Sequence, residues 1–232
     1  MFFYDPNYLL FMAPALLLVT LASWYVNSAY GKWSRIPVRS GLTGAQAAQR
    51  LITNGGLTGV QVQGISGNLT DHYDPRDKVL RLSPGVASGA SVAAVAIAAH
   101  ELGHAMQDSD GYLPLRFRSA IVPAINIGSW LGWIMIFAGL ILRMANLAWL
   151  GVMVFSGGAV FALATLPVEL NASARAKRLL ADTGIIAGED EQNGVNTVLN
   201  AAALTYVAGL AAAILQLLYF VSLVSGMGGR RR

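Results

Sequence analysis

The chain has 232 residues, of which 55% are hydrophobic and only 12% are charged, and this composition excludes an ordinary soluble protein. It contains no cysteine, which excludes disulfide bonds and a zinc site built from thiolates. The net charge of +4 comes from basic residues scattered beside apolar runs, so it indicates membrane topology and not nucleic-acid binding.

Four apolar runs approach or exceed the roughly 20 residues that a helix needs to cross a bilayer core. They are Tyr8–Tyr30, Ser119–Leu142, Met144–Val168 and a last run from about Val195 to Met227. We expect the last run to cross once; the alternative is a helix that starts in the soluble part and only dips into the membrane interface. The fold class is therefore predicted to be mainly α and integral to a membrane, with about four transmembrane helices.

The charges around these runs predict their orientation. Before the first run the chain carries Asp5 and no Lys or Arg, unlike the positive start of a secretory signal peptide. A basic segment, Lys32–Arg39, follows the run instead, which places that segment in the cytoplasm and the N-terminus outside. The basic group at 175–178 comes two spans later and agrees, whereas Arg230–Arg232 would lie outside after a single crossing, against the rule.

A small α+β part is predicted between the first run and residue 90. Thr43-Gly44-Ala45-Gln46 has the form of a capping box, and its helix should stop at Gly55-Gly56. Val60–Gln63 and Lys78–Leu82 alternate as strands on either side of a polar loop, Asp71–Pro75. The edge of such a sheet could hold an extended peptide, or the sheet could be a small core without a substrate role, and the pattern leaves both open.

The next helix carries the most informative motif. Ser88 or Ser91 would cap it, and it should continue to about Gln107. It contains His100-Glu101-Leu102-Gly103-His104, an H-E-x-x-H motif that holds two of the three histidines in the chain. An exposed polar patch is the alternative, but the preceding residues, Ser91–Ala99, are apolar on all sides and predict burial.

The motif predicts a Zn²⁺ site. Residues four apart lie on one face of a helix, so the imidazoles of His100 and His104 can converge on one metal ion. Glu101 lies beside them and is assigned as the catalytic base. Burying two imidazoles and a carboxylate without partners is costly, and a metal ion supplies the missing partner.

A third protein ligand is needed, and Glu169 is the best candidate. No histidine follows the motif closely, which excludes the metzincin pattern, so a carboxylate must serve. The second and third runs form a hairpin that returns Glu169 to the side of the membrane that holds His104. A lone Glu at a membrane boundary is otherwise expensive. The alternative is a solvated Glu at the start of a helix.

Five further residues are weaker candidates. Asn171 and Ser173 could hydrogen-bond the metal ligands or could cap a helix. His72, in the polar loop, could contact substrate or stabilise an oxyanion, although loop histidines are more often simply solvated. Tyr206 and Asn200, on the last helical segment, are additional oxyanion candidates.

Together these features predict five parts along the chain. They are a first transmembrane helix (1–30), a cytoplasmic, zincin-like α+β catalytic part with the H-E-x-x-H helix (31–118), a transmembrane hairpin (119–168), a cytoplasmic segment with the third zinc ligand (169–196), and a membrane-associated last helix with a basic tail (197–232).

Several stretches resemble one family. Leu69–Pro75, Leu82–Pro84, Ala98–Gln107 and Leu166–Ser173 look like the corresponding motifs of the YugP-type membrane zinc metallopeptidases. The resemblance implies a multi-pass enzyme of a bacterial inner membrane. More distantly, Glu169-x-x-Ala172 resembles the E-x-x-A-D element of the HtpX and CAAX-protease metallopeptidases, which implies a gluzincin site with Glu169 as third ligand. Ser173 stands where that wider group has an aspartate.

The leading functional hypothesis is a membrane-embedded zinc endopeptidase that hydrolyses peptide bonds near the cytoplasmic face. Its expected partners are a peptide or membrane-protein substrate and the lipid bilayer, and membrane-protein quality control is a role suggested by analogy. The alternative is a catalytically silent zinc-binding scaffold or a metal-transport protein. Transport predicts further ionisable residues near mid-membrane, and the spans contain few.

Overall fold

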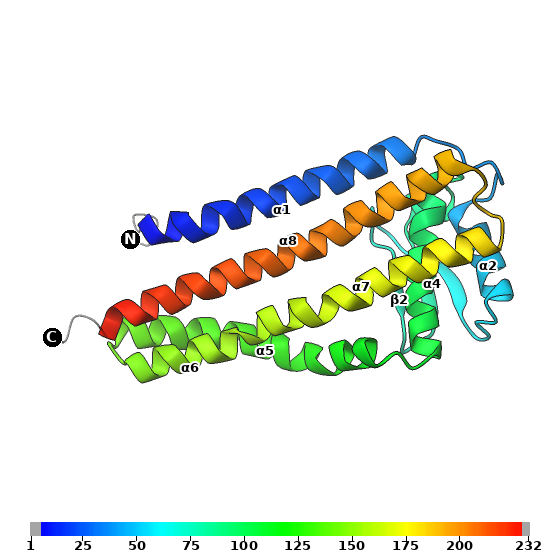
Figure 1. Ribbon diagram of the computed structural model, residues 1–232. Helices are drawn as coiled ribbons and strands as arrows, with labels where there is room; N and C mark the ends of the chain where they lie inside the picture. The colour runs from blue at the N-terminus through cyan, green and yellow to red at the C-terminus, as the bar shows by residue number, and fades with distance from the viewer. Residues whose placement is uncertain (1–5, 229–232) are drawn as a thin grey trace. The chain divides into compact units, whose positions relative to one another are not determined.

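The computed structural model describes residues 6–228, so Asp5 and the Arg230–Arg232 tail lie outside the described residues. The elements can be followed by colour in Figure 1. In chain order they are α1 (Pro6–Trp33), α2 (Gly44–Asn54), β1 (Gln61–Gly64), β2 (His72–Asp74), β3 (Val79–Leu82), α3 (Pro84–Ala87), α4 (Val92–Ser109), α5 (Leu113–Ile141), α6 (Ala145–Phe155), α7 (Gly157–Asp182) and α8 (Glu189–Gly228).

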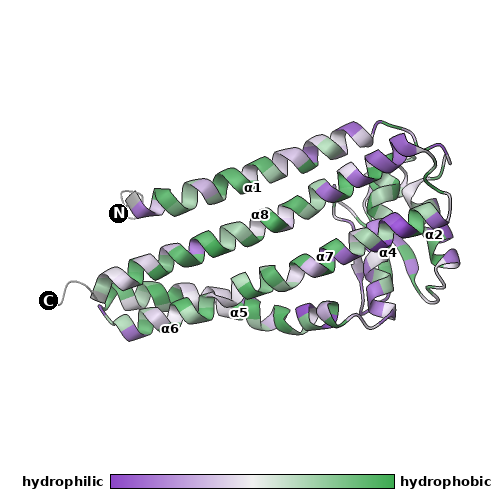
Figure 2. Ribbon diagram, viewed as in Figure 1, coloured by the Kyte–Doolittle hydropathy of each residue, from purple (hydrophilic) through white to green (hydrophobic). Residues whose placement is uncertain are grey.

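The described chain divides into two compact units. One, the apolar unit, contains the residues up to Ala22, then Phe117–Leu166 and the residues from Thr205 onward. The other, the α+β unit, contains Ser23–Arg116 and Pro167–Leu204. Helices that run from one unit to the other change in hydropathy along their length. Figure 2 shows this for α8, whose first turns, starting with Glu189, are hydrophilic and whose later turns are hydrophobic.

Helices α2 and α4 begin at the capping residues that the sequence predicts. Thr43 forms a capping box with Gln46, whose side chain accepts from the Thr43 N–H while the Thr43 hydroxyl accepts from the Gln46 N–H. Ser91 caps α4 by accepting from the Ala94 N–H. Of the two serines expected to start α4, Ser91 is therefore the cap.

The small sheet has the order β1-β3-β2, with β1 parallel and β2 antiparallel to the central strand β3. The expectation of a polar loop over Asp71–Pro75 is wrong, because His72–Asp74 forms β2. Its three residues are polar and too few to show an alternating pattern, so only pairing with β3 reveals them as a strand. His72 is consequently a strand residue and not a loop residue.

The core of the α+β unit surrounds α4. Many residues of this helix are small and fully buried, including Ala93, Ala96, Ala98 and Ala99. Leu51 of α2, Leu80 of β3, and Leu180 and Leu199 of α7 and α8 complete the same cluster. Because most of α4 is buried, a polar residue on its buried side, such as Gln107, needs a partner within the protein.

The apolar unit confirms the expected membrane character. Four stretches of helix, Asn7–Trp33, Leu113–Ile141, Ala145–Asp182 and Glu189–Met227, are long and apolar enough to cross a bilayer. At most 22% of the most apolar window of any of them is buried inside the protein. Large side chains such as Trp130, at 76% exposure, and Ile141, at 78%, therefore need lipid as their solvent.

Two helix boundaries differ from the expectation. The expected third run, Met144–Val168, is divided between α6 and α7, with the change of helix at Ser156. Helix α7 then continues without interruption to Asp182, past Pro167. Glu169 thus lies in the interior of α7 and not at a helix start, and its backbone is held by the helix on both sides.

Candidate metal centre

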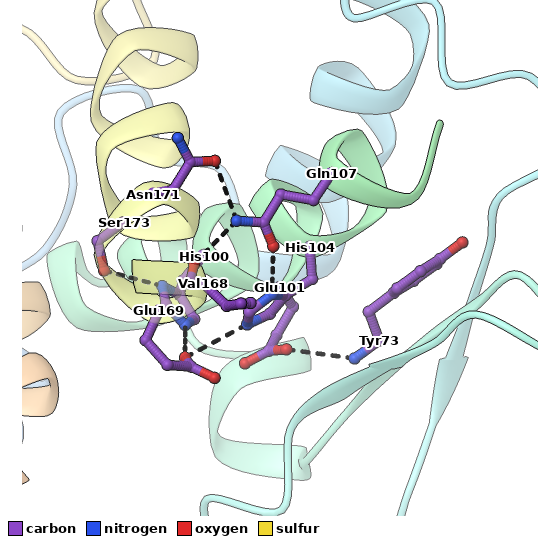
Figure 3. A network of polar contacts seen from close by, with 9 residues as sticks. All are labelled: Tyr73, His100, Glu101, His104, Gln107, Val168, Glu169, Asn171 and Ser173. Carbon is purple, nitrogen blue, oxygen red and sulfur yellow. Dashed lines mark hydrogen bonds and ion pairs between the residues drawn. The ribbon is translucent and has the colours of Figure 1, made fainter. Parts of the chain in front are cut away.

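The side chains of His100, His104 and Glu169 converge from two helices of the α+β unit (Figure 3). The two histidines lie one turn apart on α4, with ring centroids 5.0 Å apart. One carboxylate oxygen of Glu169, Oε2, lies 3.3 Å from His100 Nε2 and 3.4 Å from His104 Nε2. The three candidate ligand atoms all lie within 4.8 Å of one another.

This spacing fits a zinc ion. Two ligand atoms that each lie about 2.1 Å from a tetrahedral zinc are about 3.4 Å from one another. The observed separations of 3.3 Å and 3.4 Å between Glu169 Oε2 and the two ring nitrogens have that size. Glu169 is also buried, at 2% exposure, so its charge needs a cationic partner. Two neutral imidazoles and a carboxylate form a donor set that zinc accepts.

A glycine lets the two helices approach closely enough to assemble this set. A Cβ atom at Gly103 would lie 2.4 Å from the carbonyl oxygen of Ala172. Any side chain at 103 would therefore push α7 away from α4. Gly103 lies inside the H-E-x-x-H motif and Ala172 lies three residues after Glu169, so this close contact between α4 and α7 lies beside the candidate ligands.

Each histidine has a hydrogen-bond partner for the ring nitrogen that faces away from Glu169. His100 Nδ1 lies 3.1 Å from Ser173 Oγ, and His104 Nδ1 lies 3.0 Å from Gln107 Oε1. Ser173 therefore contacts one of the candidate zinc histidines. Such outer contacts orient a ligand and raise its basicity.

The Gln107 side chain links this contact to α7. Its Nε2 donates to the Val168 carbonyl oxygen at 2.8 Å and to Asn171 Oδ1 at 3.0 Å. Asn171 Oδ1 also accepts from Arg175 Nε at 2.8 Å, and the Arg175 guanidinium pairs with Asp110. Asn171 therefore orients Gln107 and does not itself contact a histidine. Gln107 was not singled out in the sequence, although its position three residues after His104 places both on one face of α4.

Glu101 is held next to the candidate ligands by β2. Its Oε2 accepts from the Tyr73 backbone N–H at 3.2 Å, and the Tyr73 hydroxyl donates to Asp108 Oδ2 at 3.0 Å. Tyr73 thereby joins β2 to α4 at two positions, Glu101 in the motif and Asp108 about two turns later. Loss of solvent raises the pKa of the Glu101 carboxyl, while the nearby His100 and His104 oppose that rise. A carboxyl with a raised pKa is a stronger proton acceptor.

Comparison with known proteins places the chain in a family. Residues 8–225 match the family described as "Putative neutral zinc metallopeptidase". The chain is also 44% identical, over 207 residues, to the "Putative membrane protease YugP" of Bacillus subtilis (strain 168), a match that covers 89% of this chain and 92% of that protein.

The chain belongs to this zinc metallopeptidase family. The resemblance drawn from the motifs is thereby confirmed, and with it the expectation of a zinc-dependent membrane peptidase as the class of protein. No solved structure matches the chain. The roles of individual residues in this chain remain predictions that the geometry above supports.

Two of the remaining candidates, His72 and Asn200, have hydrogen-bond partners outside the ligand set. His72 Nδ1 lies 2.9 Å from the Thr70 carbonyl oxygen, on the strand that also carries Tyr73. Asn200, on α8, accepts from Lys177 Nζ at 2.9 Å through its Oδ1. That contact ties α8 to α7 and gives Asn200 a structural task. Tyr206 belongs to the apolar unit, so its assignment as an oxyanion donor stays a prediction.

Proposed function

We propose that this chain is a membrane-embedded zinc endopeptidase with His100, His104 and Glu169 as metal ligands and Glu101 as the base. The observation that carries the proposal is the convergence of three ligand atoms within 4.8 Å at the H-E-x-x-H helix, with the Glu101 carboxylate beside them. The proposal includes a gluzincin arrangement, because the third ligand is a Glu from a later helix.

The residues of the site have separate tasks in peptide hydrolysis. Bound zinc would polarise the scissile carbonyl and lower the pKa of water. Glu101 accepts a proton from the attacking water and then delivers it to the leaving amine. The Tyr73 N–H, 3.2 Å from Glu101 Oε2, keeps the carboxylate aimed at the site before substrate arrives. Burial raises the pKa of the carboxyl, which makes it a stronger acceptor for the proton of the attacking water.

An extended segment of polypeptide is the substrate that suits this arrangement. Strand β2 pairs with β3 along one side only, and the N–H of its central residue, Tyr73, points to Glu101 on the other side. A peptide that lies extended beside this edge of β2 would lie near Glu101 and bind through backbone groups other than the Tyr73 N–H, which Glu101 holds. Such binding ignores most side chains, so we propose unfolded segments, including those of membrane proteins, as substrates. A role in quality control would follow from that preference.

The active site is proposed to face the cytoplasm of the cell, in the inner membrane of a bacterium. Support comes from the basic residues that follow the first span and from those near 175–178, which cytoplasmic loops favour. The natural chain has no cysteine, so a single Asn68→Cys change gives one labelling site in the exposed loop before β2. An impermeant thiol reagent should label it only after cells are opened. Labelling of intact cells would reverse the proposed orientation.

The peptidase proposal is tested with the purified full-length protein in detergent or lipid. It should cleave a denatured protein, lose that activity to a zinc chelator and regain it when zinc is restored. The matched Glu101→Gln protein, which differs by one amide, should be inactive under the same conditions and so exclude a contaminating protease. A scaffold or transport protein would bind zinc without cleavage. Cleavage that resists chelation would also reject the proposal.

A further inference from the structure

We propose that Gln107 is a positioning residue that holds His104 with its Nδ1–H toward the glutamine, so that Nε2 is the nitrogen left to bind metal. The inference rests on the proposed function only in taking His104 as a metal ligand. It does not depend on whether the chain cleaves peptides.

The orientation of the Gln107 amide follows from its neighbours. The Val168 carbonyl oxygen, 2.8 Å from Gln107 Nε2, can only accept a hydrogen bond. A carboxamide oxygen in that position would face another lone pair, so the NH₂ group must point to α7. The Oε1 atom is then the one that faces His104, and because an amide oxygen only accepts, His104 Nδ1 must carry the proton across their 3.0 Å contact.

A second constraint gives the same result. Arg175 has only donors, so its Nε, 2.8 Å away, requires that Asn171 present an oxygen to it. That same Oδ1 lies 3.0 Å from Gln107 Nε2, which again requires an NH₂ group at this end of the glutamine. Gln107 is fully buried, at 0% exposure, so water does not compete for either end. The Val168 carbonyl directly, and the Arg175 guanidinium through Asn171, thus require the same orientation of the Gln107 amide.

The other histidine lacks such a constraint. Its partner, Ser173 Oγ at 3.1 Å from His100 Nδ1, is a hydroxyl that can donate or accept. The hydroxyl adapts to whichever nitrogen carries the proton, so it does not select one form of His100. We therefore expect Gln107 to matter more for metal binding than Ser173, although each side chain lies within hydrogen-bond distance of the Nδ1 atom of a candidate ligand.

The test uses zinc-loaded, full-length protein in which histidine is labelled with ¹⁵N. The chain has three histidines, so the ring signals can be assigned with a His72→Gln variant and the variants below. The wild-type protein should show a His104 Nδ1–H proton that exchanges slowly with water. Gln107→Leu should abolish that protected signal, and Ser173→Ala should alter the His100 signal while leaving the His104 signal intact.

Zinc affinity is the second readout, measured by competition with a chromophoric chelator. Gln107→Leu should weaken it by about 10- to 100-fold, the usual effect of losing a partner that orients a ligand, and Ser173→Ala should weaken it less. Asn171→Asp keeps an acceptor for both Gln107 and Arg175 and should bind zinc like wild type, whereas Asn171→Leu removes that acceptor and should not.

Two results would overturn the proposal. One is a Gln107→Leu protein with wild-type zinc affinity and an unchanged His104 signal. The other is a wild-type protein whose His104 Nδ1–H exchanges freely, and this result does not depend on the folding of the Gln107→Leu variant. A protein that shows the protected signal but cleaves nothing would reject the peptidase proposal alone, so the two failures are distinguishable.

Discussion

Two helix crossings, one in each unit, depend on glycine in the same way. In the apolar unit α5 meets α6 at Gly139, where a Cβ would lie 2.5 Å from the Ala148 nitrogen. In the α+β unit α4 meets α7 at Gly103, where a Cβ would lie 2.4 Å from the Ala172 carbonyl oxygen. Small residues permit close backbone approach in both.

The difference lies in what the neighbouring positions carry. The first crossing belongs to an apolar cluster in which the rings of Trp133, Phe155 and Phe220 pack edge to face, with centroids 5.0–6.1 Å apart. Near the second crossing the side chains are the candidate metal ligands, Glu101 and Gln107. The close approach of α5 and α6 therefore allows apolar packing, whereas the close approach of α4 and α7 brings the candidate ligands together. A glycine inside the H-E-x-x-H motif is therefore a geometric requirement of the candidate site, whereas Gly139 is a requirement of packing alone.

Removal of a ligand should have the largest effect. His100→Ala or Glu169→Ala leaves two protein ligands, so most bound zinc and all measurable cleavage should be lost. Elemental analysis of protein purified without added metal, together with cleavage of one denatured substrate, measures both. A Glu169→Ala protein with full zinc content would remove Glu169 from the ligand set.

Gly103→Val and Gly139→Val distinguish the roles of the two helix crossings. Each adds a side chain where the backbone of another helix lies, so each should destabilise the protein by about 1–3 kcal/mol or more. Only Gly103→Val should also lower zinc affinity, because only that crossing brings ligands together. Thermal unfolding and chelator competition give the two quantities.

Gly209→Ala is the matched control for these variants, since nothing lies within 4 Å of a Cβ at that helical position. It should leave zinc affinity unchanged and should, if anything, stabilise the protein slightly. Equal zinc affinity in the Gly103→Val and Gly139→Val proteins would contradict the geometric role of Gly103.

Tyr73→Phe should have a moderate effect on turnover. It removes the hydroxyl that donates to Asp108 at 3.0 Å but leaves the Tyr73 backbone N–H that holds Glu101. The loss of one such hydrogen bond is worth about 0.5–1.5 kcal/mol, so we expect up to roughly tenfold lower kcat at unchanged zinc content. Unaltered kcat would mean that the Tyr73 hydroxyl does not help to place β2.

A lipid-facing change should have the smallest effect. Ile141 is 78% exposed on α5, so Ile141→Leu exchanges one apolar surface for another and should leave zinc affinity, cleavage and unfolding temperature unchanged. Parallel assays with the Gly139→Val protein, altered only two residues away, provide the comparison. A clear loss of stability in Ile141→Leu would show that this face packs against protein.

The parts of the fold that the sequence predicted depend on local signals. The capping box at Thr43 and the cap at Ser91 act within one helical turn, and the apolar runs reflect composition alone. Strand β2 was missed because its identity comes from β3, a partner several residues further along the chain. The division between α6 and α7 was missed because apolar residues flank Ser156 on both sides, so composition gives a single run.

The residues of the candidate site likewise divide into those that the sequence predicts and those that only the packing reveals. His100, Glu101 and His104 follow from a short spacing on one helix, and Glu169 follows from counting ligands and spans. The contacts of Gln107 with Val168 and Asn171 join positions about sixty residues apart and required the packing of α4 on α7. Side chains whose task is to orient others carry no signal of their own in a single sequence.

The central claim is that Glu101 performs chemistry while His100, His104 and Glu169 hold zinc. Glu101→Gln keeps the size of the side chain and removes the proton acceptor. The decisive measurement is therefore zinc content and cleavage rate on the same preparation of this variant. The account predicts wild-type zinc content with cleavage reduced by at least about 100-fold, the usual contribution of a general base. Wild-type cleavage, or loss of zinc equal to that of Glu169→Ala, would contradict it.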